Sequence, residues 1–149
     1  MPQRAPAAAH YCAPLAQLGL ATREFFHSLA TPHSIPGAGP QPIIVHPGSG
    51  SPRKNWPWER WLELIARLPA PVTVVIGEAE ADRWARVGVT TFSRLENQPL
   101  PVLREHLSAC RFFMGHDSGI SHLAAACGAP CLLLFGPTDP GMWAPPAPH

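Results

Sequence analysis

Short apolar runs alternate with amphipathic stretches over residues 41–143 of this chain. Apolar runs bounded by glycine, proline or polar residues are typical of buried strands. They predict strands at 43–45, 72–76, 89–92, 111–114 and 131–135, the last of them fully buried, with 93–99 as a loop. Between the runs, apolar residues recur at the spacing of one helix face. The clearest series is Trp58, Trp61, Leu62, Ile65 and Leu68, in a helix that begins near Pro57.

A helical stretch separates each predicted strand from the next, and no tight-turn signal joins two strands directly. This alternation predicts an α/β domain built on a doubly wound parallel sheet. In such a sheet, the loops that leave the carboxyl ends of the strands share one edge, where ligands bind. The loops that should line that edge contain residues 48–54, 77–80, 115–119 and 136–139.

Outside this region the patterning is weaker. Residues 1–40 contain one periodic apolar series, from Tyr11 to Leu20, and then a connector rich in proline and glycine at 35–40. We predict that 1–40 is the remnant of an upstream helix with an interdomain linker, because its apolar surface is too small for it to fold alone. The ligand-binding domain is expected at 41–143, and a proline-rich tail at 144–149.

Composition narrows the possible functions. The 149 residues are 46% hydrophobic and can bury one core. A formal net charge of +1 with no run of basic residues argues against nucleic acid as a partner. Neither a signal peptide nor a transmembrane segment is visible, and the four cysteines lack paired metal-site spacing, so we expect a soluble, cytoplasmic protein with reduced thiols.

The loop after the first strand has the composition of a phosphate site. Gly48, Ser49, Gly50 and Ser51 offer close backbone approach and hydroxyl groups, and Lys54 adds a positive charge. The loop matches neither the Walker A sequence nor the dinucleotide fingerprint. An ordinary flexible turn is the alternative interpretation.

A second anion site is predicted where the fourth strand leads into a helix. Asp117, Ser118 and Gly119 fall at the helix start, whose first N–H groups attract anions, and His122 lies one turn further on. Asp117 or Ser118 could equally act only as the N-cap. A hydrolytic triad is not supported, because Ser118 does not sit in a nucleophile elbow.

Other polar residues at the predicted edge leave alternatives open. Glu78 and Glu80 could accept ribose hydroxyls, or could complement the helix dipole. His46 and His116 lie on neighbouring loops but lack carboxylate or thiolate support for a metal, so we predict no metal site. Trp56 is placed to border a sugar or base.

Three motifs in order carry a resemblance to a known family. They are HPGSGSPRKNWP at 46–57, DSGISHLAAA at 117–126 and FGPTDP at 135–140. Over about residues 11–143 the chain resembles glycosyltransferase family 9, the heptosyltransferases of lipopolysaccharide core synthesis.

The resemblance implies a Rossmann-like domain that forms one half of a GT-B fold, the C-terminal half that binds the donor. The donor implied is an ADP-sugar, usually ADP-heptose, and the transfer is inverting, without metal or cofactor. The residues from Gly48 to Ser51 with Lys54 would hold phosphate or sugar. Asp117 to Gly119 with His122 would hold the diphosphate, and Glu78 or Glu80 the ribose.

The resemblance also implies what this chain lacks. The catalytic base and the residues that recognise a lipopolysaccharide-core-type acceptor are expected in an N-terminal domain absent here. Catalysis by this chain alone is therefore not expected. The parent protein would be cytoplasmic or peripheral at the inner membrane. Two alternatives remain: a stand-alone nucleotide-diphosphate-binding or partner module without catalysis, and a fragment of a sugar-nucleotide epimerase.

Overall fold

The computed structural model describes residues 6–19, 40–85 and 91–145. Its centre is a five-stranded sheet in the order β3-β2-β1-β4-β5. The strands are β1 (Ile43–His46), β2 (Val72–Ile76), β3 (Ser93–Glu96), β4 (Phe112–His116) and β5 (Cys131–Leu134). The helices are α1 (Ala7–Gln17), α3 (Trp58–Ile65), α4 (Glu78–Trp84), α5 (Leu100–Ser108), α6 (Gly119–Ala126) and α7 (Pro140–Trp143), with a 3-10 turn η1 (Pro52–Lys54).

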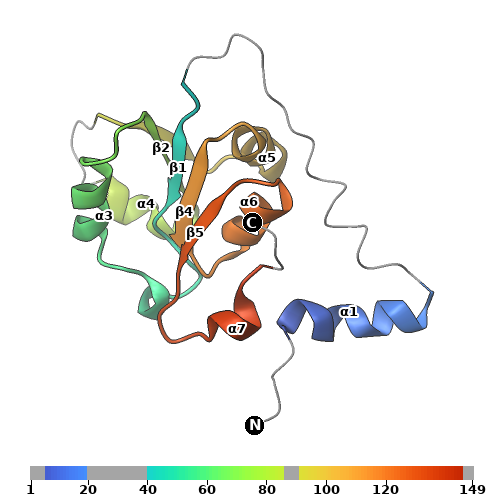
Figure 1. Ribbon diagram of the computed structural model, residues 1–149. Coiled ribbons are helices and arrows are strands. Elements are labelled where there is room, and N and C mark those ends of the chain that lie inside the picture. Colours follow the sequence, from blue (N-terminus) through green and yellow to red (C-terminus); the bar gives the residue numbers. More distant parts are fainter. Residues whose placement is uncertain (1–5, 20–39, 86–90, 146–149) are drawn as a thin grey trace.

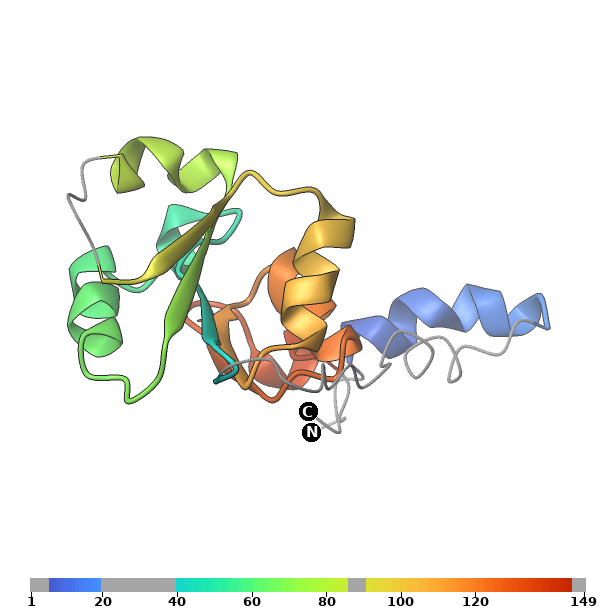
Figure 2. The same ribbon diagram turned by 90° about the horizontal axis from the view of Figure 1, so that it is seen from above.

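All four strand pairings are parallel, which confirms the predicted α/β fold class. Helices α3 and α4 lie on one face of the sheet and α5 and α6 on the other (Figures 1 and 2). β1 is the central strand, since Ile43 pairs with Val72 on one side and with Phe112 on the other.

Two apolar clusters form because side chains alternate across a strand. Ile43 and Val45 face Trp61 of α3, while Ile44 of the same strand faces Leu107 of α5. All of these except Ile43, at 8%, have no solvent-exposed surface. The predicted helix beginning near Pro57 is confirmed, with Pro57 as its N-cap.

Two predictions about the outer strands were wrong. The third strand spans Ser93–Glu96, which was predicted to be a loop, rather than 89–92, of which 89–90 lie outside the described residues. β5 is half-exposed rather than fully buried, with Leu132 46% exposed. Both are the outermost strands of the sheet, paired on one side only, so they need no continuous apolar run.

α1 lies apart from the sheet and contacts α7 (Figure 1). It confirms a helix in the first 20 residues, although Leu20 and the connector at 35–39 lie outside the described residues. No described helix is both long and apolar enough to cross a membrane.

Candidate functional site

The polar site lies where the strand order reverses. β1 is followed by α3 on one face, whereas its neighbour β4 is followed by α6 on the opposite face. The two connections therefore diverge, and the crevice between them is where doubly wound sheets bind ligands. We call residues 47–57, which follow β1, the β1 loop, and residues 117–121, which follow β4, the α6 start.

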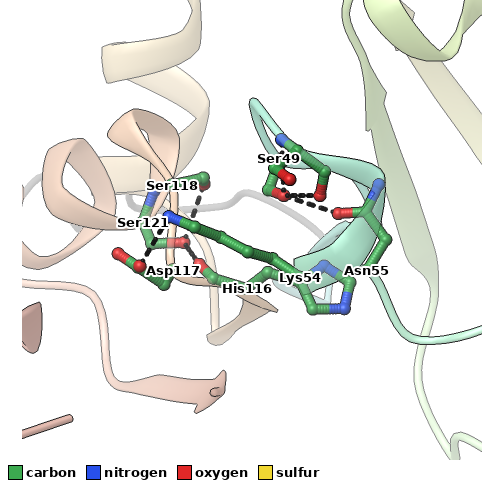
Figure 3. Close-up of polar contacts among 8 residues, drawn as sticks. Ser49, Lys54, Asn55, His116, Asp117, Ser118 and Ser121 are labelled. Atoms are coloured by element: carbon green, nitrogen blue, oxygen red, sulfur yellow. Dashed lines mark hydrogen bonds and ion pairs between the residues drawn. The ribbon is translucent and has the colours of Figure 1, made fainter. Parts of the chain in front are cut away.

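An ion pair bridges this crevice (Figure 3). Lys54 Nζ of the β1 loop lies 2.8 Å from Asp117 Oδ2 of the α6 start. The Asp117 side chain is 8% exposed and that of Lys54 is 28% exposed. A carboxylate this buried requires a partner, and Lys54 supplies it from a residue 63 positions away in the chain. The two candidates predicted from separate motifs thus lie together.

The rest of the β1 loop is held by internal contacts. Ser49 is buried, and its Oγ lies 2.6 Å from Asn55 Oδ1 and 2.9 Å from the Ser51 carbonyl oxygen. Gly50 is exposed, and a Cβ added there would meet nothing within 4 Å. Ser49 therefore shapes the loop from inside, and the open surface of the loop is at Gly50.

Gly48 lies against the Glu80 side chain of α4. A Cβ at this position would lie 2.2 Å from Cδ of Glu80. Glu80 Oε2 in turn accepts the Gly77 N–H at 3.0 Å, which caps the helix. Glu78 is exposed in the same first turn. The structure thus brings Glu80 against the β1 loop and leaves Glu78 in solvent, and a ribose contact by either remains a prediction.

At the α6 start, Ser118 is the N-cap, which settles the choice left open between it and Asp117. Its Oγ accepts from the Ser121 N–H at 3.4 Å and lies 3.1 Å from Ser121 Oγ. A Cβ on Gly119 would meet nothing within 4 Å. The His122 side chain is exposed and makes no hydrogen bond or ion pair with the described residues. Gly119 and His122 are therefore accessible to a ligand.

Two buried histidines complete the site, and the sequence had left their roles uncertain. His116 Nε2 accepts the Trp56 N–H at 2.8 Å, and the ring stands edge-on to Trp61 with centroids 5.3 Å apart. His46 Nδ1 lies 3.4 Å from Ser118 Oγ. Burial, and after it the charge of His116, lowers the pKa of His46 from 6.5 to about 4. Burial also lowers the pKa of His116, although the nearby Gly48 backbone opposes that shift.

Ser121 and Asn55 are polar partners that the sequence reasoning missed. Ser121 is fully buried in α6 and donates its hydroxyl to the His116 carbonyl. A serine three residues after a capping serine lies on the same side of the helix, which was a usable signal. Asn55 carried no such signal, because its contact with Ser49 depends on the path of the loop.

Two hollows border the site. The larger, about 480 Å³, runs from Arg53, Lys54 and Trp56 past His116 to the half-exposed β5. The smaller, about 110 Å³, lies between the β1 loop and α4 and is lined by Ser49, Glu80 and three tryptophans, Trp56, Trp58 and Trp84. The loop after β5 borders the larger hollow, where a Cβ on Gly136 would lie 3.8 Å from Lys54 Cα. No group of three or more histidine, cysteine, aspartate or glutamate side chains that could hold a metal occurs among the described residues.

The parallel sheet, with its strand order reversing between β1 and β4, defines a Rossmann-like α/β domain. A family model for glycosyltransferase family 9 (heptosyltransferase) matches residues 9–149. The chain belongs to this family, which confirms the resemblance carried by the three motifs.

Individual relatives agree with this assignment. Lipopolysaccharide heptosyltransferase 1 of Pseudomonas aeruginosa is 36% identical over 113 residues, which are 72% of this chain and 31% of that protein. The solved structure of the E. coli heptosyltransferase WaaC with ADP is 28% identical with a TM-score of 0.62, and the match covers 83% of this chain and 38% of that one. A family 9 glycosyl transferase from Veillonella parvula shares the fold, with a TM-score of 0.70 at 24% identity over 95% of this chain and 47% of that one. The chain spans about a third of the length of the curated relatives it matches.

Proposed function

We propose that this chain is the donor-binding domain of an inverting glycosyltransferase that uses an ADP-sugar, ADP-heptose in particular. The observation that carries the proposal is the Lys54–Asp117 pair at the switch point, in a family with a member solved in complex with ADP. An ammonium group and a carboxylate side by side suit a ligand that has both a diphosphate and sugar hydroxyls. The domain would form one half of a GT-B fold.

Each part of the ligand has a matching group. Lys54 and the first-turn N–H groups of α6, at Gly119 and Ile120, would hold the diphosphate, since the N-terminus of a helix favours anions. We assign Asp117 to the sugar hydroxyls rather than to the diphosphate that the resemblance implied, because its carboxylate would repel the phosphate charge. His122 is exposed one turn along and can reach the same phosphate. Glu78 or Glu80 would meet the ribose.

The chemistry assigned to this domain is stabilisation of the leaving group. An acceptor hydroxyl oxygen bonds to the anomeric carbon while the bond from that carbon to the diphosphate oxygen breaks, and ADP departs. Negative charge builds up on the diphosphate, where Lys54 and the α6 amides stabilise it. The proton of the acceptor goes to a base that we assign, with the lipopolysaccharide-core-type acceptor, to a further domain.

Calorimetry with the full 149-residue chain tests the proposal. ADP and ADP-heptose should bind, and Lys54→Ala should weaken both by about tenfold or more, equivalent to the loss of one charge-assisted hydrogen bond. Arg60→Ala is the matched control, because Arg60 pairs with Glu63 on the exposed side of α3. Failure of ADP and of other nucleoside diphosphates to bind at millimolar concentration would overturn the assignment.

Two further measurements separate the alternatives. If ADP binds but the chain, joined to its parent's remaining domain, transfers no sugar, a binding module without catalysis is the better description. Conversion of a UDP-sugar to its epimer would instead indicate an epimerase. Sugar transfer by the 149 residues alone would show that the base lies within this chain.

A further inference from the structure

We propose that His116 is a positioning residue of the donor site, whose neutral ring fixes the β1 loop so that Lys54 faces the α6 start. This inference rests on the proposed function, because it concerns the geometry in which Lys54 meets the diphosphate. His116 itself is buried and need not touch the donor.

The hydrogen bond between Trp56 and His116 lies beside the Lys54–Asp117 ion pair in the chain. Trp56, whose N–H donates to His116 Nε2 at 2.8 Å, lies two residues after Lys54. His116 immediately precedes Asp117, the ion-pair partner of Lys54. The hydrogen bond and the ion pair therefore join the same two segments at neighbouring points. Two such connections fix both the distance and the orientation of the β1 loop relative to the α6 start.

The His116 ring is also buried and packed against an aromatic neighbour. His116 is 1% exposed, and Trp61 packs edge-on against it. Its carbonyl oxygen accepts the buried hydroxyl of Ser121, which fixes the backbone (Figure 3). Because the ring is buried and packed, the Trp56 N–H that it accepts is held in a fixed position.

The hydrogen bond from Trp56 also determines which ring nitrogen of His116 carries the proton. Nε2 can accept the Trp56 N–H only when it carries no proton, so the neutral ring has its hydrogen on Nδ1. Nδ1 is buried and makes no hydrogen bond of full geometry with the described residues, but it lies toward the Gly48 carbonyl. One ring thus faces the β1 loop near both of its ends, at Gly48 and at Trp56.

Protonation of His116 would place a second N–H against that of Trp56 and release the loop. Burial opposes protonation by lowering the pKa of His116. Of the charged groups around it, Arg53, Lys54 and a protonated His46 also oppose it, whereas Asp117 favours it. ADP affinity should therefore be constant around neutral pH and decline only at a pH below 6.5, where His116 takes up a proton at its lowered pKa.

Two substitutions at His116 test the proposal by calorimetry with ADP. His116→Phe keeps the aromatic packing but removes the acceptor, and should weaken ADP about five- to thirtyfold at pH 7.5, the effect of about 1–2 kcal/mol. His116→Gln can accept the Trp56 N–H through its amide oxygen without titrating. It should restore most of the affinity and lose the acid-side decline that is due to His116. Full ADP affinity in His116→Phe, or an unchanged pH profile in His116→Gln, would overturn the proposal.

A ligand-free measurement separates this inference from the proposed function. In NMR spectra of the wild-type chain without nucleotide, the Trp56 amide should exchange slowly and its shift should follow His116 titration. The His116→Phe variant should show fast Trp56 exchange with unchanged exchange in β1, which also shows that it is folded. Fast Trp56 exchange in the wild type would sink the His116 proposal, whereas absent ADP binding with a protected Trp56 amide would sink only the proposed function.

Discussion

The two segments that meet at the crevice are held in different ways. Besides the internal contacts of Ser49, the β1 loop depends on residues far away in the chain: Glu80 lies against Gly48, and His116 accepts from Trp56. The α6 start is held largely by its own helix, through the Ser118 cap and Ser121. A loop shaped by distant contacts is sensitive to changes across the domain, whereas a capped helix start is a local unit.

The difference matters for function because Lys54, the proposed cation of the site, belongs to the β1 loop, which depends on distant contacts. The oriented N–H groups belong to the α6 start, which depends on local ones. We therefore expect changes under the β1 loop to alter ligand binding at a distance, and changes at the α6 start to remain confined to it.

Acidification should have the largest effect, because His46 lies beneath both segments. Its pKa falls from 6.5 when unfolded to about 4 in the folded protein. The unfolded chain then binds the proton more readily between these values, so stability is complete above pH 6.5 and declines as the pH falls toward 4. A shift of this size corresponds to about 3 kcal/mol. Urea unfolding at pH 7.5, 5.5 and 4.5 measures it.

His46→Asn is the comparison for that experiment, since asparagine does not titrate and can still reach Ser118. Its stability should depend less steeply on pH than that of the wild type. Equal pH dependence of the two proteins would show that the acid sensitivity arises elsewhere.

Gly48→Ala should be next in size. The added Cβ would overlap the Glu80 carboxylate, which must leave the Gly77 N–H that it caps. We expect a loss of about 1–2 kcal/mol in the free energy of unfolding, chiefly from the lost cap, because the Glu80 side chain can move aside. Gly50→Ala is the matched control, with open space around its Cβ, and should change stability by less than about 0.5 kcal/mol.

A double substitution sharpens this prediction. In a Glu80→Ala background the obstructing carboxylate is gone, so adding Gly48→Ala should cost much less than it does alone. Additive losses would mean that the close approach of Gly48 and Glu80 does not limit the loop.

Lys54→Met should have an intermediate effect on stability. It leaves the Asp117 carboxylate, which is 8% exposed, without its cation, at a cost of about 1–2 kcal/mol. Because Lys54 is 28% exposed, water can take over part of its role, which keeps the loss below that of a fully buried pair. Asp117→Asn added to Lys54→Met should recover stability in thermal unfolding. No recovery would show that the pair matters little to the fold.

The features that could be predicted from the sequence are those that depend on local contacts, and the features that could not be predicted depend on distant ones. The order of elements and the parallel sheet follow from local patterns, which predicted them, and the pattern narrowed the α6 cap to Asp117 or Ser118. β3 was misplaced because an edge strand of sequence Ser93-Arg94-Leu95-Glu96 needs no apolar run. Topology predicted that the loops carrying Lys54 and Asp117 share one sheet edge, but not that the two side chains form an ion pair.

What the sequence did not predict are contacts between elements that no periodicity encodes. The bond from Trp56 to His116 joins residues 60 positions apart and depends on the path of the β1 loop. The same holds for Glu80, for which the sequence suggested a ribose contact or a role at the helix dipole but not its contact with Gly48. Its distance from the loop is set by how α4 docks on the sheet.

The smallest effect is expected for Ser118→Ala, which removes the α6 cap. The N–H of Ser121 loses its side-chain acceptor, and the expected loss is about 1 kcal/mol. His122→Ala, on an exposed position of the same helix, is the control and should leave stability unchanged. Amide exchange localises the change: if the α6 start is a local unit, protection should fall within α6, and the Trp56 amide should stay protected. Loss of protection at Trp56 would show that Ser118, through its contact with His46 at 3.4 Å, also supports the β1 loop, and that the two segments are not held independently.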